Sequence, residues 1–334
     1  ALPIYPGPAC YGLGGTAPTV TDANFALGLL DAESFAGGVM QINMAAAEAS
    51  LDGLAESANL SRAEIAQGIR DVVNETMASA ARVHIAERGK DPRRYALLAT
   101  GGGGPLHGAD VARKLGLKRM ISPASAGVAS AIGLLIAPAR VDRVATVAKR
   151  MDQLDWSEFE QTFARMEADA RQVIAATGLN AESARVERRA DVRYVGQAFE
   201  IVVDLPPGPY DSHSATSLQG AFEKAYLAQF TRTPPAGPVE IINVRIAASA
   251  DASVAATNAS NAATDTPKLK GERPVWSPAE KAYRTTPVYD RYALRPGDAF
   301  DGPALVEERE STLAAPERSR FIVAAGGEIV IDLD

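Results

Sequence analysis

The sequence predicts an α/β protein, with an α/β lobe followed by an α+β domain and a small β-rich C-terminal region. Three observations support this prediction. Short apolar runs alternate with helical patterns around a run of glycines at residues 101–104, two β-rich runs lie between helical patterns within residues 155–230, and short β runs separated by turn signals fill residues 273–334. The 334 residues, 46% of them hydrophobic, are enough for about two or three domains.

Residues 1–140 are predicted to form the α/β lobe. Its Pro- and Gly-rich start predicts a loop, and a helix is expected near Asn24 with Asp22 as its cap. A long amphipathic helix is expected over residues 61–88. Its N-terminus carries the capping-box pair Ser61 and Glu64, its end is marked by Gly89, and its apolar positions are Ile65, Ile69, Val72, Met77 and Val83.

The second half of this lobe alternates strands with helices. The predicted elements are a strand at 95–98, the glycine loop, a helix at 105–115, a strand at 118–122 and a small-residue helix at 127–137. This alternation is what predicts the α/β class.

The remaining chain divides into three segments. Residues 141–249 are expected to form the α+β domain, with helices at 155–177 and around 218–230 and strands in ARVERRADVRYVGQAFEIVVDL and VEIINVRIAA. Residues 250–272 are rich in Ala, Asn, Ser and Thr without periodicity, so a flexible connector is expected there. Residues 273–334 form the β-rich C-terminal region.

Composition excludes several classes of function. The net charge is −7 and the basic residues do not cluster, so nucleic acid is not an expected partner. Ser, Pro and Gly interrupt the most apolar window, residues 120–137, so no membrane span is predicted. The single cysteine, Cys10, cannot form an internal disulfide, and three dispersed histidines show no metal-ligand spacing. We expect a soluble, cytoplasmic protein without a metal site of its own.

The motif LLATGGGGPLHGAD, at residues 97–110, is the most informative stretch. A glycine in regular structure costs roughly 0.5–1 kcal/mol relative to Ala, so some interaction must offset the run. Free backbone N–H groups at the start of a helix suit a nucleotide. The spacing matches neither the P-loop, because no Lys follows, nor the Rossmann fingerprint. From the residues alone, a tightly packed turn and a ligand loop are equally compatible with the motif.

Four further positions have two interpretations each. Asp22 could face phosphates or cap a helix, and His107 could touch a base or ribose or bond to backbone at a helix start. Cys10 could be a nucleophile or a buried, inert cysteine, and no basic neighbour in the sequence activates it. The polar and aromatic cluster around Arg193 and Tyr194 indicates surface or an interface, with substrate contact as the alternative.

Six segments carry a specific resemblance. They are PGPACYGLGGTAPTVTDANFALGLLD, FAGG, ATGGGGPLHGADVARKLGL, SPASAGVASAIGLLIA, DVRYVGQAFEI and VYDRYALRPGDAFDGPALVEERESTLAAP. In this order they resemble the hydantoinase A / 5-oxoprolinase family, which also includes subunits of acetone and acetophenone carboxylases. The resemblance covers nearly the whole chain.

The resemblance implies an actin-like, sugar-kinase-like ATPase core that uses ATP and Mg²⁺. The segment matching the adenosine-side loop implies nucleotide contacts from Gly101, Gly102, Gly103, Gly104, Pro105 and His107. The segment GVASAIGLL matches the second interlobe connecting helix. The implied reaction is phosphorylation of a cyclic amide, such as a hydantoin or 5-oxoproline, for hydrolysis. The alternatives are a ketone carboxylase subunit acting with bicarbonate and a non-catalytic assembly subunit.

The resemblance also implies partners. Full-length members carry two Asp-Gly-Gly-Thr phosphate loops upstream, and neither occurs in this sequence, since GLGGTAPT lacks the preceding Asp. We therefore expect an upstream ATPase half or subunit that carries these loops, and a hydantoinase B-like subunit. A split subunit, a processed product and a fragment are all compatible with this pattern. The chain alone is expected not to hydrolyse ATP.

Overall fold

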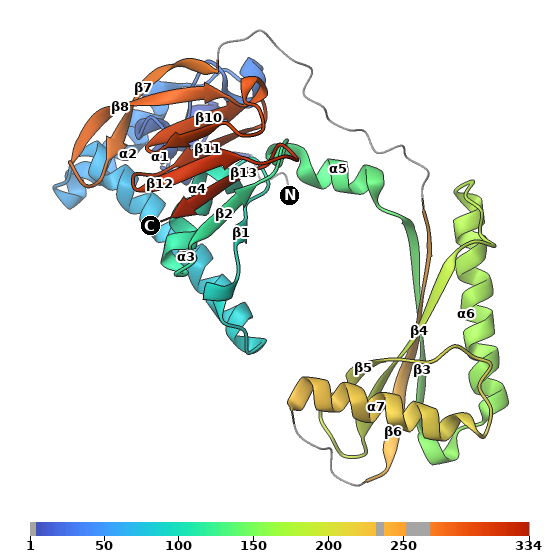
Figure 1. Cartoon of the computed structure of the whole chain (residues 1–334). Helices are drawn as coiled ribbons and strands as arrows, with labels where there is room; N and C mark the ends of the chain where they lie inside the picture. Colours follow the sequence, from blue (N-terminus) through green and yellow to red (C-terminus); the bar gives the residue numbers. More distant parts are fainter. Residues whose placement is uncertain (1–4, 232–236, 252–267, 334) are drawn as a thin grey trace. The chain divides into compact units, whose positions relative to one another are not determined.

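The computed structural model describes residues 5–231, 237–251 and 268–333, which belong to two compact units (Figure 1). Unit 1 comprises Ala1–Gly133 and Asn258–Asp334, and unit 2 comprises Leu134–Thr257. The division falls within helix α5 (Ala129–Ile136). Of the predicted connector, 250–272, residues 252–267 lie outside the described residues. Among the described residues, no helix is both long and apolar enough to cross a bilayer.

Four helices shape the N-terminal part of unit 1. They are α1 (Val20–Ala26), α2 (Met44–Ala58), α3 (Arg62–Glu87) and α4 (Gly104–Lys114). The predicted capping box closes α3, because the Ser61 hydroxyl accepts from the Glu64 N–H and the Glu64 carboxylate accepts from the Ser61 N–H at 3.0 Å. Helix α2 was not predicted from the sequence. That helix buries only Ala47, Leu51 and Ala55, which leaves a weak apolar pattern.

The buried face of α3 differs from the predicted apolar stripe. Ile65 is buried as expected, but Val72 and Val83 are 66% and 59% exposed. In the middle of the helix, Arg70 and Asn74 occupy the buried face instead. Burial of polar side chains requires hydrogen-bond partners, and these partners lie in the candidate site described below.

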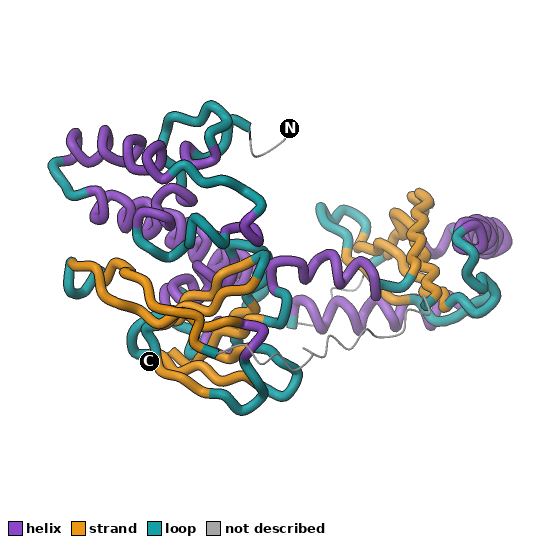
Figure 2. Tube along the Cα trace, turned by 90° about the horizontal axis from the view of Figure 1, so that it is seen from above, coloured by secondary structure: helices purple, strands orange, loops and turns teal. Residues whose placement is uncertain are grey.

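Unit 1 contains two sheets (Figure 2). The first has the order β1-β2-β13-β12-β9, from strands β1 (Leu97–Leu98), β2 (Arg119–Ser122), β9 (Ala299–Asp301), β12 (Ser319–Val323) and β13 (Ile329–Leu333). Strands β1 and β2 are parallel, and the other neighbours are antiparallel. The β-rich C-terminal region therefore completes the sheet that the α/β lobe begins, and Met120, Phe321, Ile329 and Ile331 are buried in their shared core.

The second sheet of unit 1 has the order β11-β10-β8-β7. Its strands are β7 (Leu269–Ser277), β8 (Ala282–Asp290), β10 (Ala304–Glu308) and β11 (Ser311–Ala315). Helix α4 contacts β2 and β13 of the first sheet and β11 of the second. Its N-terminus is therefore held between the two sheets of one unit.

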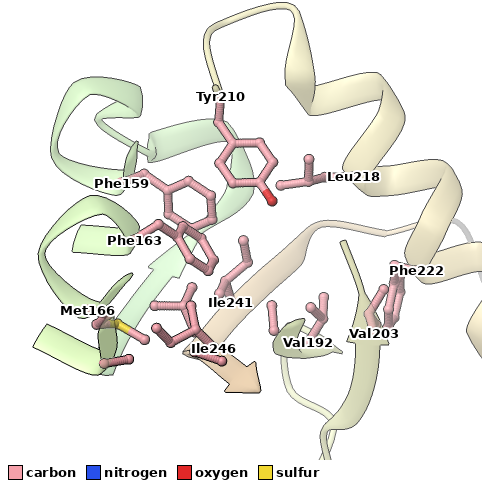
Figure 3. Packing of buried hydrophobic residues seen from close by; sticks show 14 of the residues in the cluster. Phe159, Phe163, Met166, Val192, Val203, Tyr210, Leu218, Phe222, Ile241 and Ile246 are labelled. Atoms are coloured by element: carbon pink, nitrogen blue, oxygen red, sulfur yellow. The ribbon is translucent and has the colours of Figure 1, made fainter. Parts of the chain in front are cut away.

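Unit 2 is an antiparallel sheet of order β3-β6-β4-β5 with α6 and α7 packed against it (Figure 3). Its elements are β3 (Ala139–Arg150), α6 (Trp156–Ala176), β4 (Arg185–Tyr194), β5 (Ile201–Asp204), α7 (Ser214–Phe230) and β6 (Val239–Ala250). Phe159 and Phe163 of α6 meet Tyr210 and the sheet residues Ile241 and Ile246 in the core. The sequence analysis predicted each of these elements except β3.

Short 3-10 turns connect the longer elements. They are η1 (Ala9–Tyr11), η2 (Phe35–Gly38), η3 (Pro92–Arg94), η4 (Ala126–Val128), η5 (Met151–Gln153) and η6 (Arg291–Ala293).

Candidate functional site

The glycine loop joins β1 to α4, and each glycine has a different environment. Gly101 has φ +86°, a conformation that favours glycine, and its N–H donates to the Ala126 carbonyl at 2.8 Å. A Cβ on Gly102 would lie 3.2 Å from the Glu310 carbonyl oxygen. A Cβ on Gly103 would meet nothing within 4 Å. Backbone conformation thus accounts for Gly101 and packing against Glu310 for Gly102, whereas Gly103 borders open space.

Helix α4 begins directly at this loop. Gly103 is its N-cap, and Pro105 lies in the first turn, where a missing N–H breaks no helical hydrogen bond. Gly104 has a looser fit, since a Cβ there would stand 3.6 Å from the Ala99 carbonyl carbon. The first N–H groups of α4 and the positive end of its dipole therefore lie next to glycines, which have no side chains to cover them.

A cavity of about 1040 Å³ within unit 1 opens beside the loop. Gly102, Gly103 and His107 line it on the loop side, and the β10–β11 hairpin lines it with residues that include Glu310. The volume is at the upper end of the range for small-molecule sites, roughly 300–1,000 Å³. Side chains of the described residues do not fill this space.

The tip of the β10–β11 hairpin fixes the outer wall of the loop. A Cβ on Gly127, in η4, would lie 2.5 Å from the Glu310 Cβ, so only glycine permits this approach. Glu310 thus packs against Gly102 and Gly127 together, although they are 25 residues apart in the chain. The glycine loop, η4 and the C-terminal hairpin form one wall.

The cavity wall carries both signs of charge. Its acidic residues are Asp31, Glu33, Asp290, Glu307, Glu308 and Glu310, and its basic residues are Lys270 and Arg309. Glu307 is neutralised by Lys270 at 2.6 Å and by Arg273. Within the described part of the chain, no group of three or more His, Cys, Asp or Glu side chains is arranged to hold a metal ion.

Below the loop, five buried or half-buried side chains form a closed ring of hydrogen bonds. Arg70 donates to the Asn24 amide oxygen at 3.0 Å, and the Asn24 amide nitrogen lies 3.2 Å from His107 Nε2. His107 Nδ1 lies 2.7 Å from the Asn74 amide oxygen. The Asn74 amide nitrogen and Arg70 both donate to one Asp110 carboxylate oxygen, at 3.2 and 2.8 Å, which closes the ring.

This ring determines the protonation of His107. Because Asn74 donates through its amide nitrogen to Asp110, its oxygen must accept, so His107 carries its proton on Nδ1. Nε2 then accepts from Asn24, whose oxygen is taken by Arg70. Burial lowers the pKa of His107 to about 4, the Arg70 cation acts in the same direction, and Asp110 acts against it. His107 is a neutral member of a polar network, and it reaches the cavity wall together with Asn24.

Asp22 has a structural role, and the prediction that it is the N-cap is wrong. The N-cap of α1 is Thr19, and Asp22 is the third helical residue of a capping box. The Asp22 carboxylate, fully buried, accepts from the N–H groups of Ala9, Cys10 and Thr19 at 3.2, 2.8 and 2.9 Å. The described residues that line the cavity include Thr21 but not Asp22.

Cys10 is fully buried next to Asp22. Burial raises the pKa of the Cys10 thiol, and the neighbouring carboxylate adds to this effect. A thiol in this state is a poor nucleophile, which agrees with the interpretation of Cys10 as a buried, inert residue.

The cluster around Arg193 has a local structural explanation. Arg193 pairs with Glu240 at 2.7 Å, Tyr194 packs on Phe222 and Tyr226, and the Gln197 side chain accepts from the Tyr194 N–H.

Sequence reasoning found the loop and His107 but missed the residues that hold them. Arg70, Asn74 and Asn24 come from α3 and α1, which lie 33–83 residues upstream of His107. One signal was present: Arg70 and Asn74, four residues apart, lie on the face of α3 that also carries Ile65 and Ala66. A polar pair inside an apolar stripe indicates a buried network.

Comparison with known proteins identifies the family. Residues 1–143 match the hydantoinase/oxoprolinase model, and residues 146–325 match the model of the hydantoinase/oxoprolinase C-terminal domain. The chain belongs to the hydantoinase/oxoprolinase family. Its resemblance to this family, expected from six sequence segments, is confirmed.

Two curated relatives show the range of chemistry in this hydantoinase/oxoprolinase family. The caprolactamase subunit alpha of Pseudomonas jessenii is 31% identical over 93% of this chain and 46% of that protein. The acetophenone carboxylase gamma subunit of Aromatoleum aromaticum is 29% identical over 98% of this chain and 46% of that protein. The chain therefore spans about half the length of the curated relatives it matches.

The fold is confirmed by a solved structure. The ATP-dependent caprolactamase of Pseudomonas jessenii superposes with a TM-score of 0.74 at 28% identity, covering 99% of this chain and 49% of that one. The mixed α/β architecture predicted from the sequence is that of the corresponding part of this enzyme.

Proposed function

We propose that this chain forms the adenosine side of the nucleotide site of an ATP-dependent cyclic amide hydrolase of the hydantoinase/oxoprolinase type. The observation that carries the proposal is the cavity of about 1040 Å³ at the start of α4, where Gly103 borders open space. Family membership supports it, as does the ATP dependence stated for the caprolactamase with the same fold.

The residues of this chain would bind and orient the nucleotide. Gly101–Gly104 let a ligand approach the main chain, and the N-terminus of α4 provides donors and a positive field. When bound, ATP supplies the phosphoryl group that makes an unreactive amide oxygen a better leaving group. The contribution of the loop is orientation, because rigidly held reactants lose less entropy on the way to the transition state.

We also propose Mg²⁺ as the companion of ATP. The described residues offer no metal group, so its ligands would come from the upstream half or subunit that carries the phosphate loops. A hydantoinase B-like subunit is the second proposed partner. A cytoplasmic location is also part of the proposal.

Two classes of substrate are compatible with this proposal. A cyclic amide such as a hydantoin or 5-oxoproline suits the hydrolase, and a ketone with bicarbonate suits the carboxylase. The similarity to the acetophenone carboxylase gamma subunit favours keeping the second candidate. Assays with both substrate classes on the assembled enzyme distinguish them.

The Gly103→Val variant tests the nucleotide role. A Val there enters open space and displaces no protein atom, but it blocks approach to the backbone. We expect ATP affinity of the assembled enzyme, measured by calorimetry, to fall about tenfold or more. Gly53→Val is the matched control, since Gly53 is an exposed helical glycine that also has nothing within 4 Å. Equal ATP affinity in both variants and the wild type would reject the proposal and favour the assembly subunit.

A further inference from the structure

We infer that Arg70 is the positioning residue of the glycine loop, because it ties the first turn of α4 to α1 and α3 through three acceptors. The inference rests on the proposed nucleotide role of the loop and adds a residue that neither the motif nor the cavity wall identifies. Arg70 itself does not touch the proposed ligand space: the cavity beside the loop is lined by Asn24 and His107, but not by Arg70, among the described residues.

The Arg70 guanidinium is buried and bonded to two helices. The Arg70 side chain is 6% exposed, and its two terminal nitrogens donate to Asn24 on α1 and to the Leu106 carbonyl and Asp110 carboxylate on α4. The Leu106 contact is 2.6 Å and the Asp110 contact is 2.8 Å. The two terminal nitrogens of the planar fork reach acceptors on two different helices, whereas the three N–H bonds of an ammonium all start from one nitrogen atom.

The acceptors of Arg70 on α4 fix the start of that helix. Leu106, His107 and Asp110 lie in the first two turns of α4, immediately after the loop. The loop residues Gly101–Gly104 have no side chains that could hold it by themselves. Its position therefore depends on the hairpin tip on one side and on the start of α4 on the other.

Arg70 also orients its neighbours Asn24 and His107. Arg70 occupies the Asn24 oxygen, so the Asn24 nitrogen faces His107 and keeps Nε2 an acceptor. The charged groups that act on His107 are Arg70 from α3 and Asp110 from α4, and α1 contributes the neutral Asn24. Without Arg70, Asn24 can turn and His107 can take up a second proton. The unprotonated Nε2 next to the cavity is thus a consequence of Arg70, whereas Asn74 fixes the proton on Nδ1.

The test uses the chain assembled with its upstream partner. Arg70→Met removes the donors while keeping an unbranched apolar stem, and Arg70→Lys keeps the charge. We expect both to weaken ATP binding about tenfold or more, with little rescue by Lys, because one ammonium cannot replace the fork. Arg82→Met is the matched control: Arg82 is on the same helix and donates to the Lys114 carbonyl at the other end of α4. It should leave ATP affinity unchanged.

A second readout separates positioning from general stabilisation. The chain has three histidines, so ¹⁵N-histidine labelling of this chain alone resolves His107. At pH 6 the wild type and Arg82→Met should show neutral His107 with the proton on Nδ1. Arg70→Met should show a protonated fraction, and its ATP affinity should change more between pH 5 and 7 than that of the wild type, which a purely structural loss would not cause.

The outcomes are distinguishable. Wild-type ATP affinity that persists in Arg70→Met, or full rescue by Arg70→Lys, would refute the positioning role while the proposed function stands. A wild-type assembly that binds no nucleotide would overturn both. A His107 signal identical in wild type and Arg70→Met would refute the coupling of Arg70 to the tautomer.

Discussion

At the scale of single residues, His107 lies beside the proposed ligand space in an environment that does not suit an acid or a base. Its two ring nitrogens are bonded to Asn24 and Asn74, and burial holds it neutral. A general base near neutral pH needs a pKa close to 7, so the environment of His107 suits a role in structure and orientation.

The lowered pKa of His107 predicts a specific dependence of stability on pH. The unfolded chain binds a proton near pH 6.5 and the folded one near pH 4, so stability is complete above 6.5 and is lost as pH falls toward 4. Between pH 7 and 5 this single group should cost unit 1 about 2 kcal/mol of unfolding free energy.

Urea unfolding followed by the fluorescence of Trp276, in a Trp156→Phe background, measures this for unit 1 because Trp156 belongs to unit 2. His107→Gln, which cannot titrate, provides the control. A difference between wild type and His107→Gln that stays constant from pH 7 to 5 would show that His107 does not titrate as the ring requires.

At this scale, the sequence predicts features whose signal lies in adjacent residues. The glycine loop and Pro105 are visible because turn and helix-start chemistry is written in adjacent residues. The ring of hydrogen bonds is not visible in the sequence, since Arg70 and Asp110 are 40 residues apart and their contact depends on how α3 packs on α4. The role of Asp22 was nearly recognised, because the capping box lies within four residues.

At the scale of elements, clear periodicity made α4 and α6 predictable, and the capping box made α3 predictable although part of its apolar stripe is exposed. Strand β3 was missed because apolar residues occur on both of its faces: Val141, Ala145 and Val147 pack on the core, whereas Val144 is 53% exposed, so no clear alternation is visible. The pairing of β2 with β13 could not be predicted either. Register between segments about 200 residues apart is a property of the packed core and not of either segment.

Helix α5 carries a prediction of its own. It has no buried residue, and Leu134 and Leu135 are 80% and 67% exposed. An apolar helix in this state is expected to be covered by the proposed upstream half. Replacing both leucines with Glu should weaken the association of the two polypeptides at least about tenfold, as measured by sedimentation.

Leu227→Glu is the control for this experiment. Leu227 is 51% exposed on α7, so the same substitution there changes an exposed apolar residue on another element. If the double variant of α5 assembles as tightly as the wild type, α5 is not part of the interface.

At the scale of the whole molecule, we propose that the chain provides one wall of a nucleotide site. It contains the glycine loop, the cavity and the ring, but its sequence has no Asp-Gly-Gly-Thr loop, and it spans 46% of the caprolactamase subunit alpha. Phosphoryl transfer depends on donors and cations placed around the transferred group. Complementation by a second polypeptide, or by an upstream half of the same one, follows from this account.

The most direct test is ADP release by residues 1–334 alone, by the upstream polypeptide alone, and by their mixture. Each is assayed with Mg²⁺ and a hydantoin, 5-oxoproline, or a ketone with bicarbonate. We predict substrate-stimulated turnover only in the mixture, reduced when the chain carries Gly103→Val and retained with Gly53→Val. Substantial substrate-stimulated turnover by residues 1–334 alone, or a mixture that Gly103→Val leaves fully active, would contradict the account.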